Sequence, residues 1–88
     1  MIRVERRGEA FVVRTDAGTE HVVTVPDEML ADPVLGHDPE GLIRESFGFL
    51  LEREPASSIL TRFSLDVIAR YFPEYPDEIR RRLETRPP

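Results

Sequence analysis

The alternation of apolar and polar residues over the first 25 positions constrains the fold of this chain more than any other feature. A period of two is typical of strands that bury one face of a sheet. Two short segments that contain glycine, Arg7-Gly8 and Asp16-Ala17-Gly18, divide the region at intervals that suit hairpin turns. The pattern therefore predicts a three-stranded antiparallel meander over residues 1–25. Its buried face is expected to hold Ile2, Val4, Phe11, Val13, His21, Val23 and Val25.

The two turns also predict which residues lie opposite each other. A two-residue turn at the first segment would place Val4 opposite Phe11. A three-residue loop at the second segment, with Gly18 in the left-handed region, would place Arg14 opposite Glu20 as a cross-strand ion pair. Both turns bring the same set of apolar residues to one face.

Proline residues and helix-capping side chains divide the rest of the chain into short elements. Asp38-Pro39-Glu40 combines a capping carboxylate with a proline at the first helical position, so it predicts a helix start. The helix is expected to run over 39–53 and to end before Pro55. Gly41 and Gly48 lie within it, where glycine is unfavourable, so they are expected to allow close approach to the sheet.

The other predicted elements are shorter. Asp27 is expected to cap a helical turn directly after the third strand. Residues 59–63 fit either a single helical turn or a short strand. Ser64 is expected to cap a helix over 64–72, and Asp77 to cap a last short helix.

The length of the chain, 88 residues, accommodates one domain, 1–88. The expected fold class is α+β, with the meander over 1–25 packed against two to three short C-terminal helices in a helical part over 39–83. Without cysteine the chain forms neither a disulfide nor a cysteine-bound zinc site. Its apolar runs are too short for a transmembrane helix or a signal peptide, so we expect a cytoplasmic protein that does not bind a membrane.

The residue types that carry catalysis are few and scattered. The two histidines, His21 and His37, show no spacing typical of a metal site, and no serine lies in a nucleophile elbow. None of the glycines forms a phosphate-binding loop. We therefore expect neither an enzyme nor a cofactor, and a small ligand-binding domain or enzyme built around either histidine is one alternative.

Four aromatic residues lie close together in the run FSLDVIARYFPEY, residues 63–75. Aromatic side chains supply much of the core of a small domain, and they are also enriched at the centres of interfaces. We expect Phe63 and Phe72 in the core. For Tyr71 and Tyr75 both interpretations stay open, which makes these two the candidate protein-interaction residues.

A basic cluster near the end of the chain consists of Arg80, Arg81, Arg82 and Arg86. Cations at the end of a helix complement its dipole, which accounts for the cluster without a ligand. Residues 27–55, in contrast, contain two arginines and eight acidic residues, a local net charge of −6 that repels phosphate backbones. This charge argues against nucleic acid as a partner. The cluster is nevertheless the basis of an alternative function, a nucleic-acid- or ribosome-associated accessory factor.

The chain resembles a group of short uncharacterised bacterial proteins in the segments LIRESFGFLLEREP (42–55) and SSILTRFSLDVIARYFPEY (57–75), and its first 25 residues resemble their N-terminal hairpins. The resemblance implies a free-standing small domain and implies no activity, cofactor or site residue. The function we expect is a small cytosolic protein-interaction or regulatory module without catalysis. It would bind a protein partner, or a second copy of itself, through Tyr71 and Tyr75.

Overall fold

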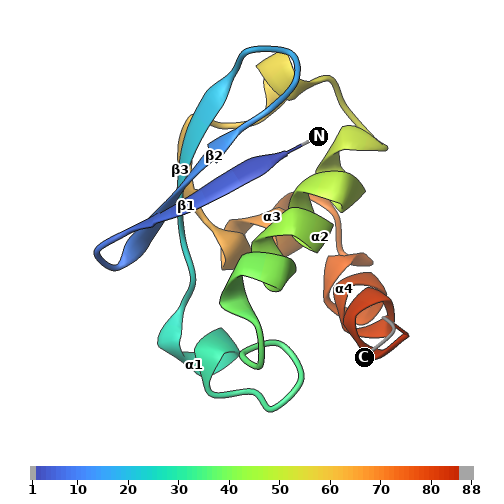
Figure 1. Ribbon diagram of the computed structural model, residues 1–88. Coiled ribbons are helices and arrows are strands. Elements are labelled where there is room, and N and C mark those ends of the chain that lie inside the picture. Colours follow the sequence, from blue (N-terminus) through green and yellow to red (C-terminus); the bar gives the residue numbers. More distant parts are fainter. Residues whose placement is uncertain (1, 86–88) are drawn as a thin grey trace.

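The computed structural model of this chain describes residues 2–85 and places a four-stranded sheet beside a group of short helices (Figure 1). The strands are β1 (Arg3–Arg7), β2 (Ala10–Arg14), β3 (Glu20–Thr24) and β4 (Arg62–Ser64). The helices are α1 (Asp27–Leu30), α2 (Pro39–Leu51), α3 (Ile68–Tyr71) and α4 (Tyr75–Glu84). Two 3-10 turns, η1 (Ala56–Ser58) and η2 (Leu65–Val67), flank β4. The predicted α+β fold class, with an N-terminal antiparallel meander and short C-terminal helices, is confirmed.

The first hairpin has the predicted buried face but a different turn. Val4 lies opposite Val13, and Arg7 lies opposite Ala10, so the turn consists of Gly8 and the residue after it. The prediction that paired Val4 with Phe11 is therefore wrong by two residues. Gly8 has φ +63° at the first central position, which is where a type II′ hairpin turn places glycine. A shift of two leaves every side chain on its original face.

The second hairpin confirms the prediction. Val13 lies opposite His21, and Arg14 lies opposite Glu20. The loop between them has Gly18 at φ +87°, the left-handed conformation that a three-residue loop needs. The predicted ion pair is present, with 2.8 Å between Arg14 Nε and Glu20 Oε2.

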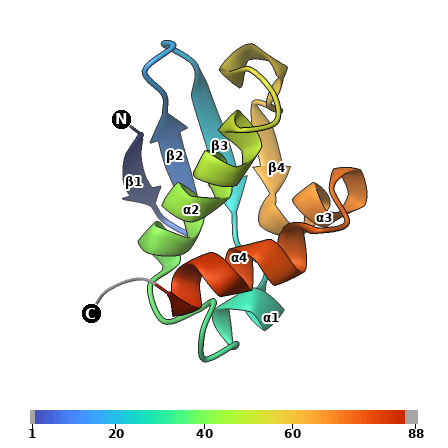
Figure 2. The same cartoon turned by 90° about the vertical axis from the view of Figure 1, so that its right-hand side faces the viewer.

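The fourth strand decides between the two interpretations left open for residues 59–63. β4 pairs in parallel with β3, and Phe63 lies opposite Val23. A parallel neighbour requires a long crossover, and here the segment containing α1 and α2 supplies it. Figure 2 shows β4 at the end of the sheet away from β1. The strand order is β1-β2-β3-β4, so β4 is an edge strand.

The core lies on both sides of α2. Asp38 caps this helix as predicted, because its side chain accepts a hydrogen bond from the backbone N–H of Gly41 at 3.1 Å. Figure 1 shows α2 between the sheet and α4. Phe47 faces the sheet residues, whereas Phe49 packs against Tyr75 of α4 with 5.3 Å between ring centroids. Both phenylalanines are fully buried.

Several predicted helix starts are wrong in detail. The helical turn after Asp27 and the 3-10 turn after Ser64 form without a side-chain capping hydrogen bond from either residue. The last helix begins at Tyr75 rather than after Asp77, which lies in its first turn. Tyr75 packs in the core as the first residue of α4, so the helix begins before Asp77, the residue best suited to cap it.

Gly48 does not serve the close approach to the sheet that we predicted. A Cβ built there would have Arg82 of α4 as its nearest neighbour, at an ordinary contact distance of 3.6 Å. Gly48→Ala is therefore expected to raise the free energy of unfolding by about 0.5–1 kcal/mol in urea titrations.

Gly36→Ala is the control for this prediction. A Cβ at Gly36 would overlap the backbone carbonyl of Leu30, so this variant should lose stability. A loss of stability in Gly48→Ala as well would show that α4 leaves no room for a methyl group at Gly48.

Candidate functional site

An apolar groove of about 320 Å³ opens beside β4, at the end of the sheet. Its wall is formed by the C-terminal end of α2, the segment between η1 and β4, and the helical segment η2–α3. Six of the lining residues illustrate its character: Leu50, Glu54, Leu60, Phe63, Ile68 and Tyr71. Five of these six are apolar or aromatic, which is typical of pockets that bind organic groups.

Two large apolar side chains at the groove are exposed. Tyr71 is 67% exposed and Leu60 is 48% exposed. No other large apolar residue among residues 2–85 is as exposed as these two. Of the two interpretations left open for Tyr71, its exposure excludes burial in the core. Leu60 was not among the predicted site residues, because its exposure follows from the path of the segment that leads into β4.

Tyr75, the other predicted interaction residue, is buried and does not contribute to an exposed surface. It is 2% exposed and lies between α2 and α4. Its hydroxyl group is 2.7 Å from Ser46 Oγ, and Ser46 in turn donates to the carbonyl of Leu42 at 2.7 Å. Because the single Ser46 proton is used there, the hydroxyl of Tyr75 is the donor to Ser46. Burial raises the pKa of Tyr75 to about 12.

His21 supports one wall of the groove from inside the protein. The residue is 1% exposed, and its ring nitrogen Nδ1 is 2.7 Å from the carbonyl oxygen of Leu60. A carbonyl only accepts, so Nδ1 carries a proton and donates to it, while Nε2 lies 2.9 Å from the hydroxyl oxygen of Thr19. His21 therefore holds Leu60 in place. His37 is exposed in the connection before α2, far in sequence from this contact.

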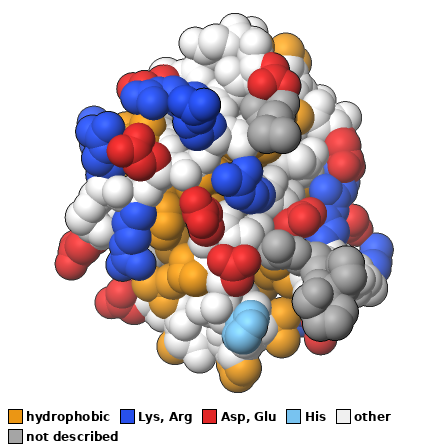
Figure 3. Space-filling view, viewed as in Figure 1, with side chains coloured by type: hydrophobic (Ala, Val, Ile, Leu, Met, Phe, Trp, Pro, Cys, Tyr) orange, Lys and Arg blue, Asp and Glu red, His pale blue; other side chains and the backbone are white. Residues whose placement is uncertain are grey.

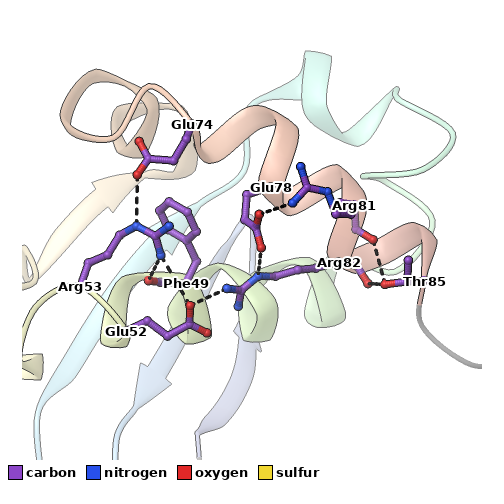
Figure 4. Close-up of polar contacts among 8 residues, drawn as sticks. All are labelled: Phe49, Glu52, Arg53, Glu74, Glu78, Arg81, Arg82 and Thr85. Atoms are coloured by element: carbon purple, nitrogen blue, oxygen red, sulfur yellow. Dashed lines mark hydrogen bonds and ion pairs between the residues drawn. The ribbon is translucent and has the colours of Figure 1, made fainter.

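Each arginine of the predicted basic cluster within the described chain faces a carboxylate. Figure 4 shows Arg81 bonded to Glu78, and Arg82 bonded to both Glu78 and Glu52. The shortest of these contacts is 2.6 Å, between Arg82 Nη2 and Glu52 Oε1. Arg86 lies outside the described residues. These carboxylates balance the positive charge of the arginines on α4.

Arg80 makes the third such pair, with Asp32 in the connection after α1. The two side chains form two contacts, of 2.6 and 3.3 Å. The Arg80 hydrogen bond, followed by the backbone N–H groups of Leu35 and Val34, holds the pKa of Asp32 well below its usual range. The pair ties α4 to the long crossover connection. Arg80 is thus engaged with a carboxylate, as Arg81 and Arg82 are.

Arg53 closes the core at the end of α2. Its guanidinium lies 3.6 Å from the centroid of the Phe49 ring, a cation–π contact (Figure 4). The same side chain donates to the Phe49 carbonyl at 3.0 Å and to Glu74 at 3.3 Å. We interpret Arg53 as a structural residue that joins α2 to the start of α4.

A second concavity, of about 370 Å³, brings together three arginines that the sequence does not group. Arg3, Arg14 and Arg44 line it together with Asp16. Arg14 already pairs with Glu20, and Arg44 donates to the backbone carbonyl of residue 2 at 2.6 Å. Figure 3 shows basic and acidic side chains interspersed on the visible face. The ion pair balances the charge of Arg14, whereas a backbone carbonyl carries no net charge and does not balance that of Arg44.

Comparison with protein-family models, with curated proteins and with solved structures finds no match to this chain. Within residues 2–85, no three histidine or acidic side chains gather where they could hold a metal ion. No helix in the same range has the length and apolar character needed to cross a membrane. Fold and surface together define a small α+β domain with an apolar groove beside an edge strand.

Proposed function

We propose that this domain is a protein-interaction module without catalysis, and that its groove receives a bulky apolar side chain from a segment of a partner protein. The observation that carries the proposal is the exposure of Tyr71 and Leu60, two large apolar side chains that line the groove. Aromatic residues beside apolar pockets are enriched at the centres of protein interfaces. Burying these two side chains under a partner would remove apolar surface from water, which is favourable.

The two alternatives have less support. Arg80, Arg81 and Arg82 are engaged by Asp32, Glu78 and Glu52, so a nucleic-acid contact would first have to break these ion pairs. A site built around histidine would need an accessible ring beside other reactive groups. His21 is enclosed and uses both of its nitrogen atoms in hydrogen bonds within the fold.

The experiment is a selection of random peptides displayed on phage, followed by affinity measurements on the selected peptides. We expect Leu60→Glu and Tyr71→Glu to weaken binding on the order of tenfold or more, because each places a charge on apolar contact surface. Leu30→Glu is the matched control, since Leu30 is 40% exposed on α1 and does not line the groove. It should change affinity by less than about twofold.

Two outcomes would contradict the proposal. One is that the selected peptides bind the three glutamate variants equally well, which would place their site elsewhere. The other is a dimer in sedimentation that Leu60→Glu dissociates, because the groove would then be filled by a second copy of this chain. Circular dichroism of each variant checks that the fold is retained.

A further inference from the structure

Glu54 is the one charged residue that lines the groove. Glu52, two residues earlier in the chain, pairs with Arg82, and Arg53 pairs with Glu74. Among residues 2–85, no ion pair or side-chain hydrogen bond reaches the carboxylate of Glu54. An unpaired carboxylate beside an apolar wall favours a cation that arrives with the ligand.

The open edge of β4 lies next to the same groove. In a parallel ladder, alternate residues of a strand direct their backbone groups toward the neighbouring strand. The N–H of Val22 donates to the carbonyl of Thr61 at 2.7 Å, just before β4. The alternation then turns the backbone groups of Phe63 toward β3 and those of Arg62 and Ser64 toward the open edge. Within residues 2–85, no strand lies beyond β4 (Figure 2).

The side chains of β4 show which face an added strand would cover. Phe63 is 9% exposed, lines the groove and lies opposite the buried Val23, so its side chain is on the core face. Arg62 lies on the opposite face, because successive side chains of a strand alternate. A strand that extended the sheet beyond β4 would therefore direct every second side chain over the groove and toward Glu54.

We propose that the partner segment is extended and basic, that it pairs with the edge of β4, and that it carries an arginine or lysine two positions from the apolar residue that fills the groove. This inference rests on the proposed function and names the chemistry of the partner. The spacing of two follows from the period of a strand. Strand addition of this kind combines backbone hydrogen bonds with side-chain pockets for specificity.

The test repeats the phage selection with Glu54→Arg beside the wild-type protein. Peptides selected by the wild-type protein should share a basic residue two positions from a bulky apolar residue. Glu54→Arg should bind these peptides about tenfold more weakly and should select an acidic residue at that position, because the charge of the site is reversed. Glu45→Arg, on α2 and outside the groove lining, is the control and should bind them within about twofold.

Hydrogen exchange measured by NMR tests the backbone part of the proposal. Bound peptide should slow the exchange of the amide protons of Arg62 and Ser64. A spacing of three or four residues, as on a helix, or unchanged exchange at both amides, would overturn the extended geometry. Selected peptides without a basic residue would overturn the role of Glu54. In each of these cases, peptide binding that Leu60→Glu still weakens would support the groove as the binding site. Peptide binding that Leu60→Glu leaves unchanged would contradict both the proposed function and this inference.

Discussion

Phe47→Ala is expected to lower the free energy of unfolding by about 3–5 kcal/mol, the range seen when a buried phenylalanine is truncated and leaves a cavity. Phe47 is fully buried, and its ring centroid lies 5.4 Å from that of His21 and 6.0 Å from that of Phe63. It thus joins α2 to β3 and β4. A domain of this size has a total stability on the order of 5–10 kcal/mol, so the variant should be close to unfolding at room temperature.

Urea unfolding followed by far-UV circular dichroism measures this loss. Leu51→Ala is the matched control, because Leu51 ends the same helix but is 38% exposed. The control should lose less than about 1 kcal/mol. Equal losses in the two variants would contradict the placement of α2, since they would mean that Phe47 is no more buried than Leu51.

The second large effect concerns the buried hydroxyl pair of Ser46 and Tyr75. Ser46→Ala leaves the hydroxyl of Tyr75 as a buried donor without an acceptor, which should cost about 1–3 kcal/mol. Tyr75→Phe removes the donor and should cost about 1 kcal/mol, because Ser46 keeps its bond to Leu42. The double variant should lose less than the sum of the two, since it leaves no hydroxyl unpaired. Strict additivity would show that the two hydroxyl groups do not interact.

The same tyrosine predicts a loss of stability in alkali. The fold favours the neutral phenol, because the pKa of Tyr75 is raised to about 12 by burial while that of an unfolded chain is about 10. Tyr75 therefore contributes about 3 kcal/mol to the free energy of unfolding. This contribution is fully present below about pH 10 and is lost as the pH rises through about 12.

The free energy of unfolding, measured in urea titrations across this pH interval, should therefore fall more steeply in the wild-type protein than in Tyr75→Phe. Tyr71→Phe is the control and should follow the wild-type protein, because Tyr71 is exposed. A parallel fall in all three proteins would mean that Tyr75 is not enclosed as described.

Local signals in the sequence were sufficient for the elements whose geometry depends on neighbouring residues. The three-residue loop with Gly18 in the left-handed region, the pairing of Arg14 with Glu20 and the capping of α2 by Asp38 all form as predicted. The first hairpin was misplaced by two residues because both pairings bury the same side chains. The choice between them depends on the turn, which places Gly8 where a positive φ is needed.

The candidate site could not be predicted in the same way, because it is formed by contacts between residues far apart in the chain. Tyr71 and Tyr75 are alike in type and flank one proline, yet α2 covers Tyr75 and leaves Tyr71 exposed. The arginines of α4 look available in the sequence until Asp32 and Glu52 approach them from other elements.

The sequence by itself determined the fold class, the meander and the main helix, since alternation, turn residues and caps act over a few positions. The tertiary structure alone decided that β4 pairs with β3, that Leu60 is held by His21, and that a groove with an unpaired Glu54 lies beside an open edge. Burial and charge pairing at a residue depend on what packs against it, and that is a property of the whole fold.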